Sequence, residues 1–416
     1  MTRNVFVITC VVLLCVAHGS RTPVAASSDP ITEWSVTASS VATASGMAPL
    51  RTPITFALLH LAMYDAVNSI VGDRVPYATH LNVAHPASAM SAAVEAGYQV
   101  LLAEFPGQRA MLDSKYHALL ADVPDSVEKS NGISVGAAVA RQLLEMRAND
   151  GRNASITYVP GSGPGVWVPT PPGFLAVTTA FLARVTPFTM DSPSQFRPAG
   201  PPDLGSRKWL ADYNEVKALG VSTGSTRSDE QTATALFWEP LAGTVWPATI
   251  RRIAREQSLD LATSARFQAA AFAAFADGLI ACWDAKFHFN SWRPVTAIQQ
   301  GDTDGNPRTD ADPGWEPLAI TPNFPEYPSG HTCATSAVAH TIENILQHEG
   351  LQHLSIPTRN VVSGQERFYR SADDAIDEVV EARMLLGLHF RSADEDGADL
   401  GRAIARHIRR EFFRRR

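Results

Sequence analysis

The sequence predicts an all-α fold of packed helical bundles with long irregular loops. Apolar residues recur at helical spacing along most of the chain, alternating β-branched runs bounded by turns are nearly absent, and two Pro/Gly-rich stretches lack periodicity. The chain has 416 residues, of which 45% are hydrophobic and 19% charged, enough for two to three domains' worth of core. Its net charge of -7 argues against a nucleic-acid coat protein or a polybasic membrane binder.

Residues 1–27 have the pattern of a cleaved signal peptide. Arg3 supplies a positive start, residues 5–17 are apolar apart from Thr9, and small residues follow up to Ser27. We expect export to the periplasm or the medium, with a retained N-terminal helix as the alternative. No later segment looks apolar for long enough to span a membrane, so we expect the mature protein to be soluble.

Residues 28–255 are predicted to form an N-terminal helical region. The stretch 160–202 is rich in Pro and Gly and is expected to be an ordered but irregular crossing. Hydrophobic periodicity predicts helices over residues 54–70, 88–105, 109–121, 126–147, 202–219, 229–239 and 248–261.

Residues 256–416 are predicted to form a C-terminal helical bundle that carries the functional site. A second irregular loop is expected over residues 301–327. The predicted helices cover residues 262–285, 329–348, 372–386 and 394–410.

The first chemical motif is KFHFNSWRP, from Lys286 to Pro294. Seven residues separate Lys286 from Arg293, so a continuous helix would place both cations on nearly one face, about 10 Å apart along its axis. Two buried like charges need a bound anion, or a carboxylate such as Asp284 beside an arginine. We predict an anion between them and a helix that ends or kinks just after Arg293, before Pro294. Two surface cations are the alternative.

The second motif is YPSGH, from Tyr327 to His331, at the start of an amphipathic helix. Ser329 stands where an N-cap residue stands, and the free amides of Gly330 and His331 would lie at the positive end of the helix dipole. Such a helix start binds anions. His331 would add a titratable group beside the anion. An ordinary capped helix with an incidental histidine is the alternative.

The third motif is RMLLGLH, from Arg383 to His389. On a continuous helix these two side chains would point about 120° apart, so they can share a ligand only if the helix ends between them. Gly387 is suitably placed to end it. His389 could then bond to the central atom of an oxyanion, although a hydrogen-bonded core histidine is the alternative. The three motifs together provide the cations and apical groups that a trigonal-bipyramidal oxyanion needs.

KxxxxxxRP, PSGH and RxxxxxH, in this order, resemble the three-part signature of vanadium-dependent haloperoxidases and the type 2 phosphatidic acid phosphatase superfamily. Further stretches look like the exported bacterial vanadium-haloperoxidase-like branch, and they are spread over most of the mature chain. These stretches are LLHLAMYDAVNSI, GVWVPTPPGF, QFRP, DYNEVKALG and WDAKFHFNSWRPVTAI. The resemblance implies a haloperoxidase-like fold of two helical bundles.

The resemblance also implies a role for each matching residue. His389 would be the vanadate ligand, or the nucleophile that accepts a phosphoryl group in a phosphatase. His331 would be the general acid–base, and Lys286 would polarise bound peroxide. The oxyanion-binding set would be Lys286, Arg293, Ser329, Gly330 and Arg383.

Two positions depart from the family pattern. Ala382 stands where the family often has Ser, and Ala393 stands where it often has the Asp that orients the ligand histidine. Asp394 or Asp396 is expected to take that place and to accept the other N–H of His389.

Three functions compete. The first is a vanadate-dependent haloperoxidase that uses hydrogen peroxide to oxidise a halide, which then reacts with a small organic acceptor. The second is an exported acid phosphatase, without vanadate, that forms a phosphohistidine from a phosphoester. The third is a non-catalytic helical binding protein with a relic site. The sequence fixes neither the halide or phosphoester nor the oligomeric state.

Two further features remain open. Cys282 and Cys333 are the two cysteines beyond the signal peptide, and they form either a disulfide or two small buried apolar side chains. Residues 402–416 are locally basic. They form a solvated helix end or, as the alternative, a contact with a membrane surface or a partner.

Overall fold

The computed structural model describes residues 29–177, 179–240, 242–350 and 355–416. The predicted signal peptide lies outside these residues. In the described parts the chain forms thirteen α-helices, three short 3₁₀ helices and one two-stranded sheet. The predicted all-α fold is therefore confirmed.

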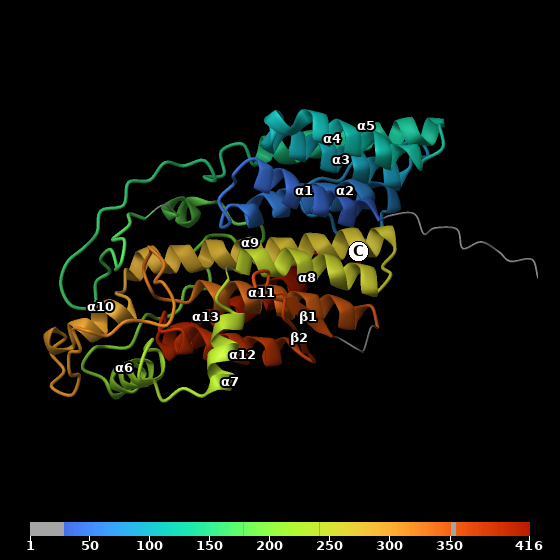
Figure 1. The fold of residues 1–416 in the computed structure, drawn as a ribbon. Helices are drawn as coiled ribbons and strands as arrows, with labels where there is room; N and C mark the ends of the chain where they lie inside the picture. Colours follow the sequence, from blue (N-terminus) through green and yellow to red (C-terminus); the bar gives the residue numbers. More distant parts are fainter. Residues whose placement is uncertain (1–28, 178, 241, 351–354) are drawn as a thin grey trace, which may run out of the picture.

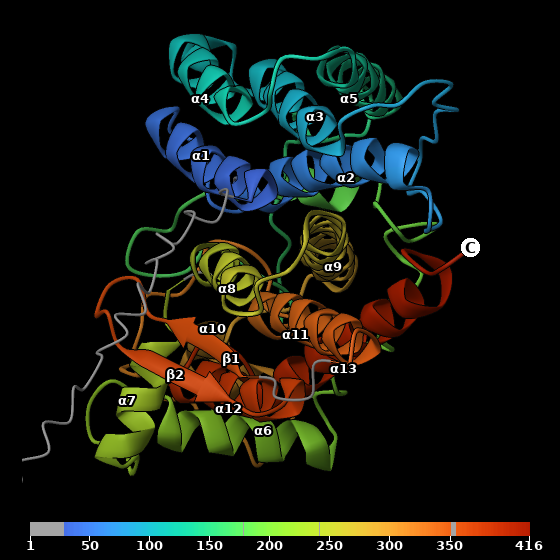
Figure 2. The same cartoon turned by 90° about the vertical axis from the view of Figure 1, so that its right-hand side faces the viewer.

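The first five α-helices form one layer of the molecule, at the top of Figures 1 and 2. The second helix is buried on almost every side because it packs on the third and fifth helices and also on the long central helix α9. The bounds of this layer are α1 (Pro30–Ala44), α2 (Thr52–Val71), α3 (Ala89–Glu104), η1 (Pro106–Gln108), α4 (Arg109–Ala121) and α5 (Val127–Met146).

An irregular crossing, interrupted by η2 (Ala180–Arg184), connects this layer to the opposite side of the molecule, as predicted. Three helices follow: α6 (Arg207–Leu219), α7 (Asp229–Phe237) and α8 (Ala242–Glu256). Serine side chains cap the first two of these helices, with Ser206 preceding α6 and Ser228 forming a capping box with Gln231.

The remaining helices surround α9 (Leu261–Phe289), which runs through the middle of the molecule. It packs on α2 on one side and on α11 and α13 on the other. α12 covers α11 and also contacts α7. The bounds are α10 (Pro294–Gln299), η3 (Gly301–Thr303), α11 (Gly330–His348), α12 (Ala372–Leu385) and α13 (Arg391–Glu411).

Several elements differ from the prediction. The helices α1 and α10 and an antiparallel hairpin of β1 (Ile356–Arg359) and β2 (Glu366–Tyr369) were not predicted. α8 begins at Ala242 and not near residue 248, because Pro247 lies inside the helix and does not precede it. A proline there removes one hydrogen bond within the helix, a loss that the packing of α8 on α9 and β1 offsets.

Two helices, α2 and α9, are long and apolar enough to cross a membrane by length and composition. The prediction that no segment after the signal peptide meets this condition was therefore wrong. The protein itself buries 89% of the apolar window of α2 and 100% of that of α9. Burial of this kind is usual for the core helices of a bundle.

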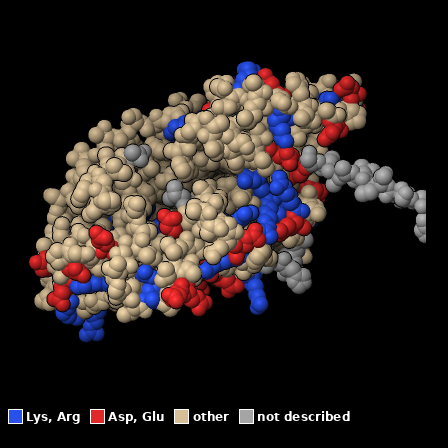
Figure 3. All heavy atoms as spheres, viewed as in Figure 1, with Lys and Arg blue, Asp and Glu red and all other residues tan. Residues whose placement is uncertain are grey.

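On the face of the molecule that Figure 3 shows, acidic and basic side chains lie close to one another over the lower half, and much of the rest carries neither. This face has no continuous basic surface of the kind that follows a nucleic-acid backbone.

Candidate active site

A small cavity lies where the end of α9, the start of α11 and the end of α12 meet; we call it the oxyanion cavity. Its volume is about 20 Å³, little more than one water molecule needs. The cavity therefore suits a compact ion better than a large ligand. Gly330, His331, Arg383 and His389 line it, together with Leu279, Trp283 and Phe324.

Lys286 and Arg293 reach this region by a route that the sequence did not predict. α9 ends at Phe289, because Asn290 adopts a left-handed conformation with φ 52°. The chain then pairs with the crossing segment: Trp292 N donates to the Gly165 carbonyl at 3.0 Å. The prediction of one helix continuing to Arg293 was wrong, and Arg293 instead lies in extended backbone before Pro294, as steric contact with proline requires.

Arg293 is fully buried and fixed by backbone carbonyls. Its Nε donates to the Phe324 carbonyl at 3.0 Å and its Nη1 to the Leu388 carbonyl at 2.8 Å. Nη1 also lies 3.2 Å from Nε2 of His389. The remaining nitrogen, Nη2, has no hydrogen-bond partner. Burial lowers the pKa of Arg293 to about 10, so it stays charged at neutral pH.

Arg383 and His389 both line the oxyanion cavity because α12 ends between them, as predicted. The left-handed backbone of Gly387, with φ 74°, turns the chain, and a Cβ there would lie 2.6 Å from the Gly220 carbonyl oxygen. Arg383 Nη1 donates to the Trp238 carbonyl at 3.0 Å, and Nε has no partner. Burial lowers the pKa of Arg383 to about 10.

Ser329 occupies the predicted N-cap position of α11, but its hydroxyl does not cap the helix. The backbone N–H of Ser329 donates to the Ala393 carbonyl at 2.9 Å, whereas Oγ is buried without a partner. The first amides of the helix, at Gly330 and His331, have no carbonyl acceptor within the helix. Trp283 lies 3.1 Å from the position of a Cβ on Gly330, so a larger residue there would press on the tryptophan.

Lys286 lies behind the cavity and does not line it. Its Nζ donates to the carbonyls of Pro325 at 3.1 Å, Glu326 at 2.8 Å and Pro328 at 2.5 Å. These three bonds use all three of its N–H groups. Lys286 therefore has no free N–H for the predicted direct contact with an anion. Lys286 instead holds the turn that leads into Ser329. Burial lowers its pKa to about 8.

Sequence reasoning missed Glu326, the carboxylate that orients His389. Its Oε1 lies 2.9 Å from His389 Nδ1 and accepts the Phe390 amide at 3.1 Å. Burial raises the pKa of Glu326 to about 7, although Arg293 and Lys286 counteract part of this rise. The signal in the sequence was an acidic residue that lies between two prolines and directly before the YPSGH motif. With Nδ1–H donating to Glu326, the Nε2 lone pair of His389 faces Arg293.

His331 is buried on the same cavity. Its Nε2 lies 3.1 Å from the Pro240 carbonyl oxygen, which can only accept, so Nε2 carries the hydrogen and Nδ1 is the basic nitrogen. Burial lowers the pKa of His331 well below its usual value, and Arg383 adds to this effect. Burial and the site cations lower the pKa of His389 in the same direction. Both imidazoles are therefore neutral at neutral pH.

Asp284, Asp394 and Asp396 make other contacts than the hydrogen bond to His389 or the ion pair with a cavity arginine considered from the sequence. Asp284 forms a two-pronged ion pair with Arg197, at 2.8 and 2.9 Å, and not with a cavity arginine. Asp396 accepts a hydrogen bond from Tyr327. Asp394 is fully buried beside the Ser329 hydroxyl, without a well-formed hydrogen bond to any described residue, and Glu326 already occupies the place beside His389 Nδ1.

Asp394 nevertheless lies close to the cavity charges. Burial raises its pKa well above the usual value, and the nearby Ser329 hydroxyl and the charge of Arg383 counteract only part of this rise. The neutral carboxyl is therefore favoured. A neutral carboxyl can donate a hydrogen bond to an anion, whereas a carboxylate would repel it.

Cys282 and Cys333 are both buried and free, which decides between the two alternatives left open by the sequence. Cys282 lies 3.5 Å from the Pro328 carbonyl, on the inner side of the turn that Lys286 holds. The two thiols fill space in the core beneath the cavity.

The residues of the cavity fit a tetrahedral oxyanion such as vanadate or phosphate. Three buried donors have no partner among the described residues: Arg383 Nε, whose residue lines the cavity, Arg293 Nη2, whose guanidinium contacts His389, and Ser329 Oγ, which directly precedes the lining residue Gly330. Each unsatisfied buried donor costs roughly 1–3 kcal/mol. A bound oxyanion would accept from them and remove that cost. The Nε2 lone pair of His389 accepts from Arg293 Nη1, and it would give up that hydrogen bond to bond to the central atom.

Comparison with known proteins agrees with this fit. Residues 266–415 match the family model described as the VCPO second helical-bundle domain. The vanadium chloroperoxidase of Curvularia inaequalis is 32% identical over 174 residues, which is 34% of this chain. The match covers only 28% of the length of that relative.

Solved structures extend the likeness to most of the chain. A structure described as the first bacterial vanadium-dependent iodoperoxidase matches with a TM-score of 0.75 and 24% identity, over 92% of this chain and 96% of that one. An apo-type bacterial vanadium-dependent chloroperoxidase matches with a TM-score of 0.67 and 18% identity, over 88% and 94%. At these identities the solved structures show the fold. Residues 266–415 therefore resemble the second helical-bundle domain of vanadium chloroperoxidases, and the chain as a whole has the helical fold of the solved bacterial vanadium haloperoxidases.

Proposed function

We propose that this protein is a vanadate-dependent haloperoxidase that oxidises a halide with hydrogen peroxide and so halogenates a small organic acceptor. The observation that supports this most directly is the set of three unpartnered buried donors around a neutral histidine, at Arg293, Arg383 and Ser329. These donors are held in place before any ligand arrives. Donors that need not reorganise stabilise developing charge most effectively.

His389 would hold the vanadium through Nε2, and Arg293, Arg383 and Ser329 would hold the oxygens. Bound vanadate would supply the Lewis acid that activates peroxide. Glu326 keeps the hydrogen of His389 on Nδ1 and thereby leaves Nε2 unprotonated, so that it can exchange its hydrogen bond from Arg293 for the vanadium. The aromatic and aliphatic walls, Trp283 and Leu279, keep bulk water away from this contact.

His331 is suited to move the proton that hydrogen peroxide must lose. Its Nε2–H is held by the Pro240 carbonyl, so Nδ1 is the nitrogen that can accept a proton. Because burial and Arg383 keep this imidazole neutral, it is a base at neutral pH. Lys286 contributes positive charge from behind the turn of residues 325–328 and holds that turn in place.

The test is an assay of the full-length protein after dialysis against orthovanadate. Bromide or iodide, hydrogen peroxide and a phenolic dye should give halogenated dye, and the vanadate-free protein should give none. A His331→Ala variant that still binds vanadate should lose rate but not vanadium content. Absence of turnover with iodide, bromide and chloride, in protein shown to contain vanadium, would contradict the proposal.

An exported acid phosphatase is the second candidate, and one observation favours it. The donor set around His389 Nε2 is the same set that a phosphoryl group in transfer needs, and vanadate resembles that transition state. Vanadate-free protein would then hydrolyse an aryl phosphate and form a phosphohistidine at His389, with vanadate as an inhibitor. If neither reaction is found, and His389→Ala and His331→Ala change no activity, a non-catalytic binding protein is left.

A further inference from the structure

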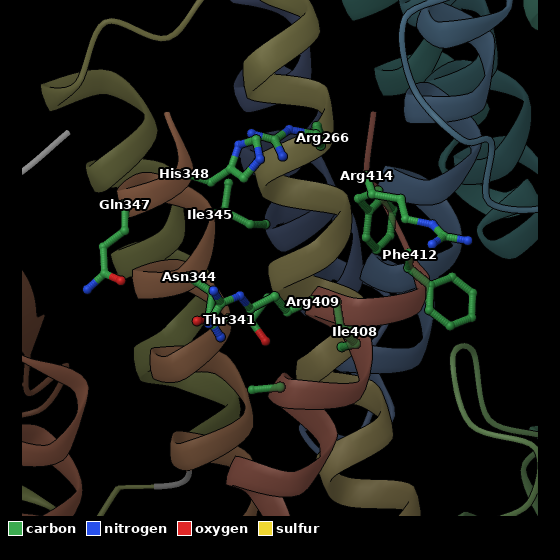
Figure 4. A pocket seen from close by; sticks show the side chains of 12 residues that line it. Arg266, Thr341, Asn344, Ile345, Gln347, His348, Ile408, Arg409, Phe412 and Arg414 are labelled. Carbon is green, nitrogen blue, oxygen red and sulfur yellow. The ribbon is translucent and has the colours of Figure 1, made fainter. Parts of the chain in front are cut away.

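A second cation-rich pocket lies between α9, α11 and α13, near the helix ends opposite to the oxyanion cavity; we call it the arginine pocket (Figure 4). Arg266 of α9 lies at one end of this pocket, twenty residues before Lys286. A separation of twenty helical residues is about 30 Å. The two sites therefore share helices but are far apart.

The lining of the arginine pocket combines positive charge with an apolar wall. Arg266, Arg409, Arg414 and His348 line it, and no acidic residue does. The apolar part of the wall is formed by Ile345, Ala405, Ile408, Phe412 and Phe413. Figure 4 shows Arg409 reaching from α13 toward α11, and His348 beside Arg266. A ligand that fits both parts has a negative head and an apolar body.

Internal ion pairs neutralise the buried arginines on this side of the molecule but not those at the rim of the pocket. Arg74 pairs with Asp73 and with Glu349, each at 3.2 Å, and Glu349 also pairs with Arg266. Arg409 and Arg414 are exposed and have no ion pair with any residue that the structure describes. Positive charge is therefore left over at the rim.

Two buried polar atoms of the lining are also unsatisfied. Thr341 is 1% exposed and Arg266 is 4% exposed, yet Thr341 Oγ1 and Arg266 Nε have no hydrogen-bond partner. A buried threonine in a helix usually bonds to the carbonyl four residues earlier. Both atoms belong to pocket-lining residues, so an acceptor on a ligand would satisfy them.

We propose that the arginine pocket binds a small amphipathic carboxylate. Its volume of about 290 Å³ lies at the lower end of the range for small-molecule sites. The carboxylate would pair with Arg409 and accept from Thr341 and Arg266, and Arg414 would add positive charge at the rim. A short alkyl body would pack on Ile408 and the two C-terminal phenylalanines. This proposal is independent of the reaction at His389.

The first test is calorimetric titration of the full-length protein with decanoate. Decanol, which has the same apolar body without charge, and inorganic phosphate, which has charge without a body, should each bind at least about tenfold more weakly. Decanol binding as tightly as decanoate would overturn the proposal, as would equally tight phosphate. Absence of saturable decanoate binding would overturn it directly.

The second test uses matched variants. Arg409→Gln and Arg414→Gln should each weaken decanoate binding about fivefold or more, and Thr341→Val, which removes only the hydroxyl, about two- to fivefold. Arg410→Gln is the control, because Arg410 is exposed on the same helix but does not line the pocket. An equal loss in Arg410→Gln would mean that overall charge governs binding, and this would overturn the proposal. So would loss of decanoate binding in His389→Ala, because the ligand would then occupy the oxyanion cavity.

Discussion

The oxyanion cavity and the arginine pocket lie at opposite ends of α9, α11 and α13, and they use cations in opposite ways. In the cavity, Arg293 and Arg383 are buried and each has at least one N–H bound to a carbonyl, so the N–H groups left over have fixed directions. In the pocket, Arg409 and Arg414 are exposed and solvated. The cavity holds about 20 Å³ and the pocket about 290 Å³.

This difference shows how the same residue type serves two purposes. A buried, carbonyl-bound arginine has already lost its side-chain freedom and its water, so it can stabilise charge without reorganising. The cost of burying such a charge is visible in the pKa values of Arg293 and Arg383, which burial lowers to about 10. An exposed arginine loses freedom and water only on binding, so it binds more weakly but accepts ligands of varied shape.

The largest expected effect separates the two sites by function. His389→Ala should lower vanadate-dependent halide oxidation on the order of a thousandfold, because it removes the group that bonds to the reacting centre. Decanoate binding should be unchanged, since the arginine pocket does not include His389. The measurement is initial rate at saturating vanadate, with circular dichroism as the folding control. A loss of less than about tenfold would refute the assignment of His389.

The next prediction tests which carboxylate orients the histidine. Glu326→Gln should lower vanadate affinity about 10- to 100-fold, the usual effect of losing the partner of a ligand histidine. Asp394→Asn should have a smaller effect, because Asp394 makes no hydrogen bond to His389. Equilibrium dialysis with vanadium analysis measures both. The reverse order of the two losses would restore the role that the sequence predicted for Asp394.

A third prediction compares how rigid the backbone is at the oxyanion cavity and at the opposite end of α11, near the arginine pocket. Gly387→Ala and Gly350→Ala both place a side chain at positive φ, with φ 74° and 76°, at a cost of about 1–2 kcal/mol each. At Gly387 the new Cβ would also meet the Gly220 carbonyl oxygen at 2.6 Å, whereas at Gly350 no atom of the described residues lies within 4 Å. We expect a total loss of about 2–4 kcal/mol for Gly387→Ala. Urea unfolding measures both, and equal losses would mean that the cavity end can relax.

The smallest expected effect concerns pH. Burial lowers the pKa of Lys286 to about 8, so its charge is present below that pH and is lost as the pH rises through it. Sulfate, whose charge is constant over this range, should therefore bind to the oxyanion cavity severalfold more weakly above pH 8 than below it. Decanoate binding should be flat there, because its pocket relies on arginines. Lys286→Met should remove the step in calorimetric titrations; an unchanged step would assign it to another group.

The convergence of the second and third motifs could be predicted because each depends on local backbone chemistry. Ser329 precedes the first residue of α11, and Gly387 allows the chain to turn after α12. These two local features bring Arg383, His331 and His389 to one cavity. Most helices were predicted for the same reason, since amphipathic periodicity and caps act over a few residues.

The errors came from contacts between distant parts of the chain. α9 ends at Phe289 because Ser291 pairs with Val166, more than a hundred residues away, and no local signal shows that pairing. Glu326 replaced Asp394 beside His389 because a loop sixty-three residues earlier folds against it. The basic C-terminus likewise gave no indication that Arg409 and Arg414 line a pocket, because that depends on the neighbouring α9 and α11.

The carbonyls that hold the cavity have a consequence for how the chain can be divided. Arg383 is fixed by Trp238 and His331 by Pro240, and Gly387 lies against Gly220. All three partners precede the family-matched segment of residues 266–415. That segment expressed alone would keep every residue of the three motifs but would lose the carbonyl groups that hold Arg383 and His331 in position. Chimaeras between relatives should therefore exchange residues 220–240 together with the C-terminal bundle.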